Sequence, residues 1–125
     1  MKTILFSILI LFSINGFAFN WKKVSEVLGN SIYVDIDNIK KHNGLIYYWR
    51  LDDLLEPYKD GTNSYIGKWK VDCGEEKQTL LNYSFYSQSM GKGKILGEDT
   101  PNKIGYPKPN EIGHTVMKFV CVNAK

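Results

Sequence analysis

Apolar and polar residues alternate along most of this chain, and the alternation predicts a protein built mainly of β-strands. Five segments carry the pattern: residues 21–27, 31–36, 45–51, 64–73 and 78–87. Within residues 45–51, Ile46, Tyr48 and Arg50 share one face of the predicted strand. Within residues 64–73, Cys73 falls in phase with the apolar positions, which places its side chain on the face that meets the core.

Short polar segments separate the predicted strands. Gly29-Asn30 and Asn43-Gly44 are turn signals, and Asn-Gly favours a hairpin that leads into the next strand. Residues 37–41 are typical of a single helical turn capped by Asp37, and residues 56–61 of a loop. The 22 residues 88–109 are rich in Gly, Pro, Lys and Asn, with a short strand expected around Ile95-Leu96. A long irregular segment in a small domain tends to be functional or mobile.

The pattern changes to helical spacing near the end of the chain. Asn110 is the expected N-cap, Glu111 belongs to the first turn, and Met117 and Cys121 flank the apolar stripe. The stripe itself consists of Ile112, Val116, Phe119 and Val120. The chain is therefore expected to adopt an α+β fold, an antiparallel sheet of about five to six strands with a C-terminal helix packed on it.

The first 18 residues are typical of a cleaved signal peptide rather than of the folded domain. A basic start, an apolar stretch over residues 4–12 and small residues before the cleavage point predict cleavage between Ala18 and Phe19. The apolar stretch is shorter than the roughly 20 residues that a spanning helix needs. We therefore expect an exported protein with one domain over residues 19–125. No cysteine lies near the cleavage point, so a lipoprotein is not expected.

The rest of the composition agrees with a small sheet-rich domain. After residue 18 the only alanine is Ala124, whereas all three Trp and all eight Tyr lie there. Scarce alanine favours strands over helices, and abundant aromatic residues disfavour disorder. Cys73 and Cys121 are the only cysteines, and an even pair in an exported chain predicts one disulfide.

None of the possible catalytic or metal-binding patterns is complete. Asp35-Ile36-Asp37 does not continue as a calcium loop, and residues 91–97 lack the spacing of a phosphate loop. No Ser-containing elbow accompanies His42 or His114. The strongest catalytic alternative is an acidic cluster, Asp52, Asp53 and Glu56, which would suit a small hydrolase. We predict no metal, no cofactor and no enzymatic activity.

Basic residues are spread along the chain, which has a formal net charge of +3. Arg50 is the only arginine, and arginine is the commonest base reader, so nucleic-acid binding is not expected. The densest group lies in the long irregular segment and consists of Lys92, Lys94, Lys103 and Lys108, with Tyr106 among them. Aromatic residues beside lysines suit a protein-contact surface, so these five residues form the predicted partner-binding loop.

The order of several short motifs resembles the surface-adhesin protein E family of Gram-negative bacteria. The matching pieces run over nearly the whole of residues 19–125: Trp21, Ile32-Tyr33-Val34-Asp35, Ile39, Tyr48-Trp49, Asp52-Asp53, Asp72-Cys73, Tyr86, Met90-Gly91-Lys92-Gly93 and Val120-Cys121. The resemblance implies an antiparallel sheet, a C-terminal helix and a disulfide that ties them together. It also implies that Gly91 and Gly93 serve a turn.

The family resemblance suggests what this protein binds. A described member of the family is an outer-membrane adhesin that binds host matrix and serum proteins and forms dimers. The resemblance therefore implies an exported, non-enzymatic protein of the periplasm or of the cell surface and outer membrane. It would bind host matrix or serum proteins, with a homodimer possible. The alternative is a periplasmic module that binds or inhibits a bacterial protein.

Overall fold

The computed structural model describes residues 18–125, so the predicted signal peptide, residues 1–18, lies outside the described residues except for Ala18. Within this range eight strands form one antiparallel sheet. The strands are β1 (Trp21–Val27), β2 (Asn30–Asp35), β3 (Lys40–His42), β4 (Leu45–Asp53), β5 (Ser64–Asp72), β6 (Lys77–Tyr86), β7 (Ile95–Asp99) and β8 (Lys103–Gly105). One short 3-10 turn, η1 (Ser89–Gly91), follows β6, and one α-helix, α2 (Ile112–Asn123), closes the chain.

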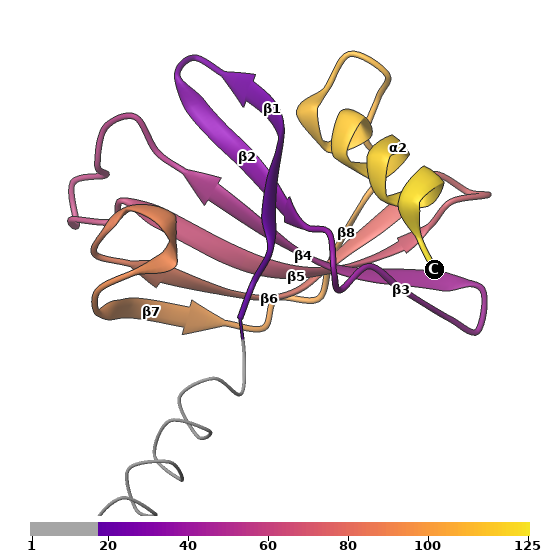
Figure 1. Ribbon diagram of the computed structural model, residues 1–125, viewed down its shortest axis with the longest axis horizontal. Helices are drawn as coiled ribbons and strands as arrows, with labels where there is room; N and C mark the ends of the chain where they lie inside the picture. Colours follow the sequence, from indigo (N-terminus) through magenta and orange to yellow (C-terminus); the bar gives the residue numbers. More distant parts are fainter. Residues whose placement is uncertain (1–17) are drawn as a thin grey trace, which may run out of the picture.

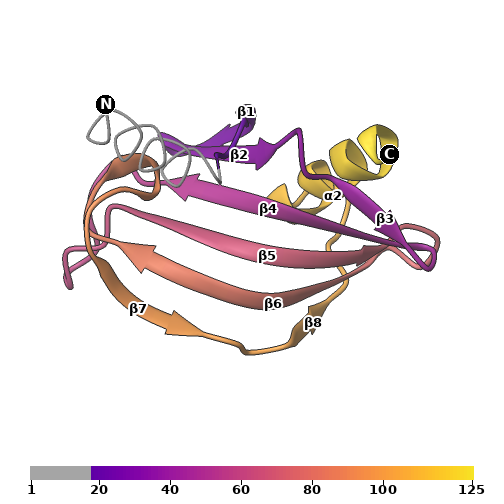
Figure 2. The same ribbon diagram turned by 60° about the horizontal axis from the view of Figure 1, so that its bottom comes forward.

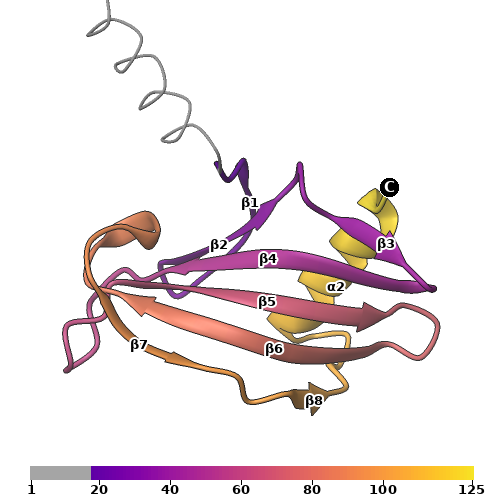
Figure 3. The same ribbon diagram turned by 90° about the horizontal axis from the view of Figure 1, so that it is seen from below.

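The strands run in the order β1-β2-β4-β5-β6-β7, with β3 paired to β4 and β8 paired to β6. The sheet is bowed, as Figure 2 shows most clearly, and α2 lies against one of its faces beside β1 (Figure 1). We call the face that carries α2 the helix face and the opposite one the outer face. Figure 3 is seen from the outer face, with the strands passing in front of α2.

The hydrophobic core fills the space between α2 and the helix face. Val116, Met117 and Val120 of the helix are buried, so the helical stripe expected from the sequence does face the sheet. Their partners in the core are Ile32, Val34, Ile39, Ile46, Tyr48 and Val71. The core occupies the part of the helix face nearest to α2, which leaves the other part of that face uncovered by the helix.

The fold class is confirmed, although the sheet has more strands than expected. The additional strands are β3 and β8, three residues each, which are too short to show an alternating pattern. The disulfide is also confirmed: Cys73, one residue after β5, is bonded to Cys121 in the last turns of α2, with a Cα–Cα distance of 6.0 Å. It joins the helix to the sheet across a sequence separation of 48 residues.

The helical turn expected over residues 37–41 is wrong. The fully buried Asp35 carboxylate accepts the Asp37 N–H at 3.2 Å and the Asn38 side-chain amide at 2.7 Å, and these bonds form a tight polar turn instead. Lys40–His42 then pairs with β4 as a hairpin. Its turn residues Asn43 and Gly44 have φ values of 51° and 79°, as a type I′ turn requires.

Two smaller predictions differ from the structure at the ends of elements. The last helix begins at Ile112 with Glu111 as its N-cap, not with Asn110. The Glu111 carboxylate accepts the Lys108 N–H at 2.7 Å, so a turn over residues 108–111 holds Asn110 outside the helix. The first hairpin turns at Leu28 and Gly29, both with positive φ, one residue before the predicted turn.

Candidate functional site

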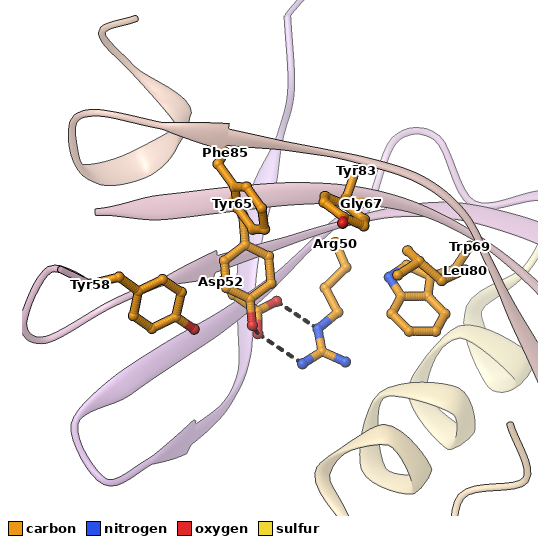
Figure 4. Close-up of a pocket in the computed structure, with 9 residues that line it drawn as sticks. All are labelled: Arg50, Asp52, Tyr58, Tyr65, Gly67, Trp69, Leu80, Tyr83 and Phe85. Carbon is orange, nitrogen blue, oxygen red and sulfur yellow. Dashed lines mark hydrogen bonds and ion pairs between the residues drawn. The ribbon is translucent and has the colours of Figure 1, made fainter. Parts of the chain in front are cut away.

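The uncovered part of the helix face contains a pocket of about 410 Å³ (Figure 4). Its lining comes from three neighbouring strands and one loop: Arg50, Asp52, Tyr58, Tyr65, Gly67, Trp69, Leu80, Tyr83 and Phe85. Five of these nine residues are aromatic, and one pair is charged. A concave, mainly apolar pocket with a few polar groups at defined positions is typical of a binding site.

The strand register explains why these side chains meet. Arg50 of β4 lies opposite Gly67 of β5, which lies opposite Tyr83 of β6. Residues directly opposite one another in adjacent strands point to the same face of a sheet. The next row, two residues along each strand, contains Asp52, Tyr65 and Phe85 in the same way.

Glycine at position 67 makes room for the pocket. A Cβ atom at Gly67 would lie 3.1 Å from Leu80 Cδ1 and 3.2 Å from Trp69 Nε1, so a larger residue would force these side chains to move. The glycine therefore leaves a gap in the row between the side chains of Arg50 and Tyr83.

Arg50 and Asp52 form a bidentate ion pair at the floor of the pocket. Arg50 Nε donates to Asp52 Oδ1 at 2.7 Å and Nη2 donates to Oδ2 at 2.9 Å, while Tyr65 Oη donates to the same Oδ2 at 3.0 Å. The two charged side chains are only 13% and 6% exposed. The guanidinium also lies 5.8 Å from the centre of the Trp69 ring, within the range of a cation–π contact.

These contacts stabilise the charged form of Arg50 and the neutral form of Tyr65. Burial by itself lowers the pKa of Arg50, but the hydrogen bonds and negative charge of Asp52 outweigh it and leave the pKa raised above its ordinary value. Burial, and secondarily the Asp52 charge, raises the pKa of Tyr65, so its hydroxyl stays a donor. The two opposite charges cancel, which leaves an aromatic pocket with no net charge at neutral pH.

Aromatic rings form most of the pocket wall around the ion pair. Phe85 makes an edge contact with Tyr65, with ring centroids 5.7 Å apart, and a tilted contact with Tyr83 at 4.9 Å. Tyr58 comes from the loop between β4 and β5 and is 49% exposed, so its ring lies at the mouth. Its backbone N–H donates to the Thr62 carbonyl at 2.9 Å, which holds the loop in a tight turn.

The predicted acidic cluster does not form one site. Asp52 and Asp53 are adjacent in β4, so their side chains point to opposite faces of the sheet. Asp53 accepts the Met90 N–H at 2.8 Å and the Ser89 hydroxyl at 3.3 Å, which anchors η1, while Glu56 is exposed in the following loop. A hydrolytic pair of carboxylates would have to converge on one substrate, and these three residues do not.

The predicted partner-binding residues are all exposed but form two groups. Lys92 and Lys94 lie between η1 and β7, whereas Lys103, Tyr106 and Lys108 lie in and after β8. Strands β7 and β8 pair with separate parts of β6 and follow one another along the same edge of the sheet (Figure 3). Tyr106 also lines a hollow of about 300 Å³ that shares Arg50 with the aromatic pocket.

The family's expected glycine turn is present between β6 and β7. Gly91 and Gly93 have φ values of 70° and 83°, in the left-handed region that favours glycine. A Cβ atom at Gly91 would lie 2.6 Å from Ile66 Cδ1, because η1 packs closely on the outer face of the sheet. This conformation and close contact explain the two glycines without a phosphate ligand.

The aromatic pocket was not predicted from the sequence. The available signal was the only arginine of the chain, placed two residues before Asp52 and therefore on the same strand face. The residues that β6 contributes to the pocket were harder to predict, because this strand contains a bulge. Lys68 of β5 pairs with Asn82 of β6, but the next residue, Trp69, pairs with Leu80. The bulge brings Leu80 to the same face as Tyr83 and Phe85, whereas strict alternation along the strand would place Leu81 there.

Residues 18–125 contain neither a metal-binding cluster nor a membrane-spanning helix. No group of three or more His, Cys, Asp or Glu side chains in this range is placed to hold a metal ion. Of the helices in this range, none is long and apolar enough to span a bilayer.

Comparison with known proteins identifies the fold and the family. Among solved structures, Haemophilus influenzae protein E is similar, with a TM-score of 0.59 and 18% identity over 82% of this chain and 84% of that chain. Protein E from non-typeable Haemophilus influenzae has a TM-score of 0.58 and 16% identity, over 87% of this chain and 80% of that one. No curated protein sequence matches the chain. The sequence model of surface-adhesin protein E matches residues 21–122, and the chain therefore belongs to the surface-adhesin protein E family.

Proposed function

We propose that this chain is an exported, non-enzymatic binding protein that receives an apolar or aromatic side chain of a protein partner in the pocket of its helix face. The observation that carries the proposal is the pocket itself, in which five aromatic rings surround an ion pair that is already satisfied. Membership of an adhesin family supports a role in binding rather than catalysis.

The chemistry of the lining favours a protein partner with an apolar anchor. Tyr, Trp and Arg are the residues that most often dominate the binding energy of protein interfaces, and here all three lie in one pocket. The Asp52 carboxylate accepts three hydrogen bonds from Arg50 and Tyr65, so it would not act as a base toward a bound group. What the pocket offers a ligand is therefore aromatic surface.

Tyr58→Ala is expected to weaken partner capture about tenfold or more without unfolding the domain. Tyr58 is half exposed at the mouth of the pocket, so truncation removes contact surface but little of the core. The measurement is capture of host matrix proteins, serum proteins and bacterial periplasmic extract by the immobilised protein, followed by affinity determination for the captured species.

Leu28→Ala is the matched control for Tyr58→Ala. Leu28 is 91% exposed in the β1–β2 turn and takes no part in the pocket, so its truncation should leave capture unchanged. Equal affinities of the wild type and Tyr58→Ala would contradict the proposed role of the pocket.

The predicted loop residues remain a second proposed contact, along the β7–β8 edge. Ile95, Leu96 and Ile104 are exposed there beside the lysines, which gives this edge both apolar and basic character. Replacing Lys92, Lys94, Lys103 and Lys108 by Glu should weaken capture of an acidic protein partner at least tenfold, because attraction becomes repulsion. Capture that is unchanged in this variant would show that the edge is not part of the interface.

The cellular location of the protein distinguishes a host partner from a periplasmic partner. We propose export by a signal peptide over residues 1–18, with Phe19 as the first residue of the mature protein; N-terminal sequencing of the exported protein tests this cleavage. Protease treatment of intact cells then separates an adhesin from a periplasmic module. Digestion on intact cells supports binding of host matrix or serum proteins, whereas complete protection supports a periplasmic partner.

A further inference from the structure

A second group of side chains gathers on the outer face of the sheet, away from the aromatic pocket. Lys40 of β3 lies opposite Tyr47 of β4, and Tyr47 lies opposite Lys70 of β5. In the neighbouring row Trp49 lies opposite Lys68. Because opposite residues, and residues two apart in a strand, share a face, these five residues form one surface, which we call the lysine–aromatic face.

The three lysines of this face lack acidic partners. None of the ion pairs formed between residues 18 and 125 includes Lys40, Lys68 or Lys70. The Lys68 ammonium instead lies over the Trp49 ring, 5.5 Å from its centre, where the ring attracts the positive charge. Strand geometry places the Cα atoms of Lys68 and Lys70 about 7 Å apart and that of Lys40 about 10 Å across the sheet.

The carboxylates beside this face form no ion pair with its lysines. Asp35 is fully buried and accepts hydrogen bonds from the Asn20 and Asp37 backbone amides and from the Asn38 side chain. Asp72 lies in the next row of β5 and accepts the Glu75 N–H at 3.2 Å. The lysine–aromatic face therefore presents three positive charges that attract an anionic ligand.

A hollow of about 270 Å³ opens between Lys40 and Lys68. Its walls include Asn38, His42 and Tyr47. The Asn38 amide nitrogen donates one hydrogen bond to Asp35 at 2.7 Å, which leaves its second N–H and the carbonyl oxygen for a ligand. The hollow thus offers ammonium donors, a hydroxyl group and an amide acceptor within one small space.

We propose that the lysine–aromatic face binds an acidic polysaccharide. Sulfate or carboxylate groups would lie at Lys40, Lys68 and Lys70, and hydroxyl groups of one sugar unit would occupy the hollow. Sugar hydroxyls both donate and accept hydrogen bonds, which matches the mixed lining. The carboxylates of an acidic peptide only accept hydrogen bonds, so they would use the lysines but not the Asn38 carbonyl oxygen. This face is opposite the aromatic pocket, so the proposal stands apart from the proposed function.

Retention of the full-length exported protein on immobilised heparin tests the proposal, with hyaluronan and neutral dextran as parallel probes. The wild type is expected to bind heparin at about 0.1 M salt, to elute as salt screens the charges, and not to bind dextran. Binding to hyaluronan as well would assign the contact to carboxylates, and binding to heparin alone would assign it to sulfates. Lys40→Gln/Lys70→Gln should weaken binding about tenfold.

The control variant is Lys22→Gln/Lys59→Gln, which removes the same charge from two exposed lysines outside this face. It should reduce binding less than twofold. Lys68→Gln removes both a ligand contact and the packing of Lys68 on the Trp49 ring. If its melting temperature equals that of Lys40→Gln/Lys70→Gln, weaker heparin binding reports the lost contact and not the lost packing. Absence of heparin binding, equal losses in both double variants, or stronger binding to poly-glutamate or to phosphatidylglycerol vesicles would overturn the proposal.

Discussion

Replacing Cys73 and Cys121 by Ser is expected to lower the free energy of unfolding by about 4 kcal/mol, the largest single effect that we anticipate. The bond closes a chain segment of 48 residues, and closing a loop of that length restricts the unfolded chain by roughly this amount on the chain-entropy model. The folded state depends on the bond in a specific way, because it fastens α2 to the end of β5 beside the core.

Thermal unfolding in oxidising buffer measures this effect. For a domain of about 100 residues, a loss of 4 kcal/mol corresponds to a melting temperature roughly 15–30 °C lower. The wild type in reducing buffer provides the matched control, because reduction should bring its melting temperature close to that of the Cys73→Ser/Cys121→Ser variant. Equal melting temperatures of the variant and the oxidised wild type would contradict a stabilising disulfide.

Asp52→Ala is expected to destabilise the domain by about 3 kcal/mol. The substitution leaves the Arg50 side chain, which is only 13% exposed, without its counter-charge, and it removes the acceptor of the Tyr65 hydroxyl. Breaking a buried ion pair on one side typically costs 3–5 kcal/mol, and partial contact with the open pocket favours the lower end. Denaturant unfolding of the wild type and the variant measures the difference.

The double variant Arg50→Met/Asp52→Leu serves as the control for the single substitution. It replaces both charges by apolar groups, so no charge is left unpaired, and it should recover most of the lost stability. A loss below about 1 kcal/mol in Asp52→Ala would mean that the pair behaves as an exposed salt bridge. Recovery in the double variant would show that the ion pair is kept for the shape and polarity of the pocket rather than for stability.

Much of the sheet could be predicted because strand signals are local. The first strand was predicted at its observed bounds, residues 21–27, and the Asn43-Gly44 hairpin follows from the backbone preference of two adjacent residues. The helical stripe around Val116 and Val120 was recognisable from spacing alone. Export is also predicted from a local pattern, residues 1–18, of which the structure describes Ala18 alone.

The predictions from the sequence are wrong or incomplete where segments distant in the chain meet. Asp37 was a plausible helix cap, but the buried Asp35 carboxylate bonds to the following backbone and prevents the helical turn. The strands β3 and β8 depend on pairing with β4 and β6, which a sequence of three residues cannot signal. The two parts of the predicted partner-binding loop are separated because β7 and β8 pair with separate parts of β6.

The sequence by itself determined the class of fold, the disulfide and the resemblance that the family match confirms, because each rests on periodicity, on composition or on motifs in a fixed order. Only the tertiary structure decided where a ligand can bind. The register of three strands and one bulge sets Arg50, Asp52 and Phe85 around a single pocket, and the hairpin of β3 brings Lys40 to the same hollow as Lys68 on the other face. Both sites depend on cross-strand neighbours, and such neighbours are set by long-range hydrogen bonding that no local pattern specifies.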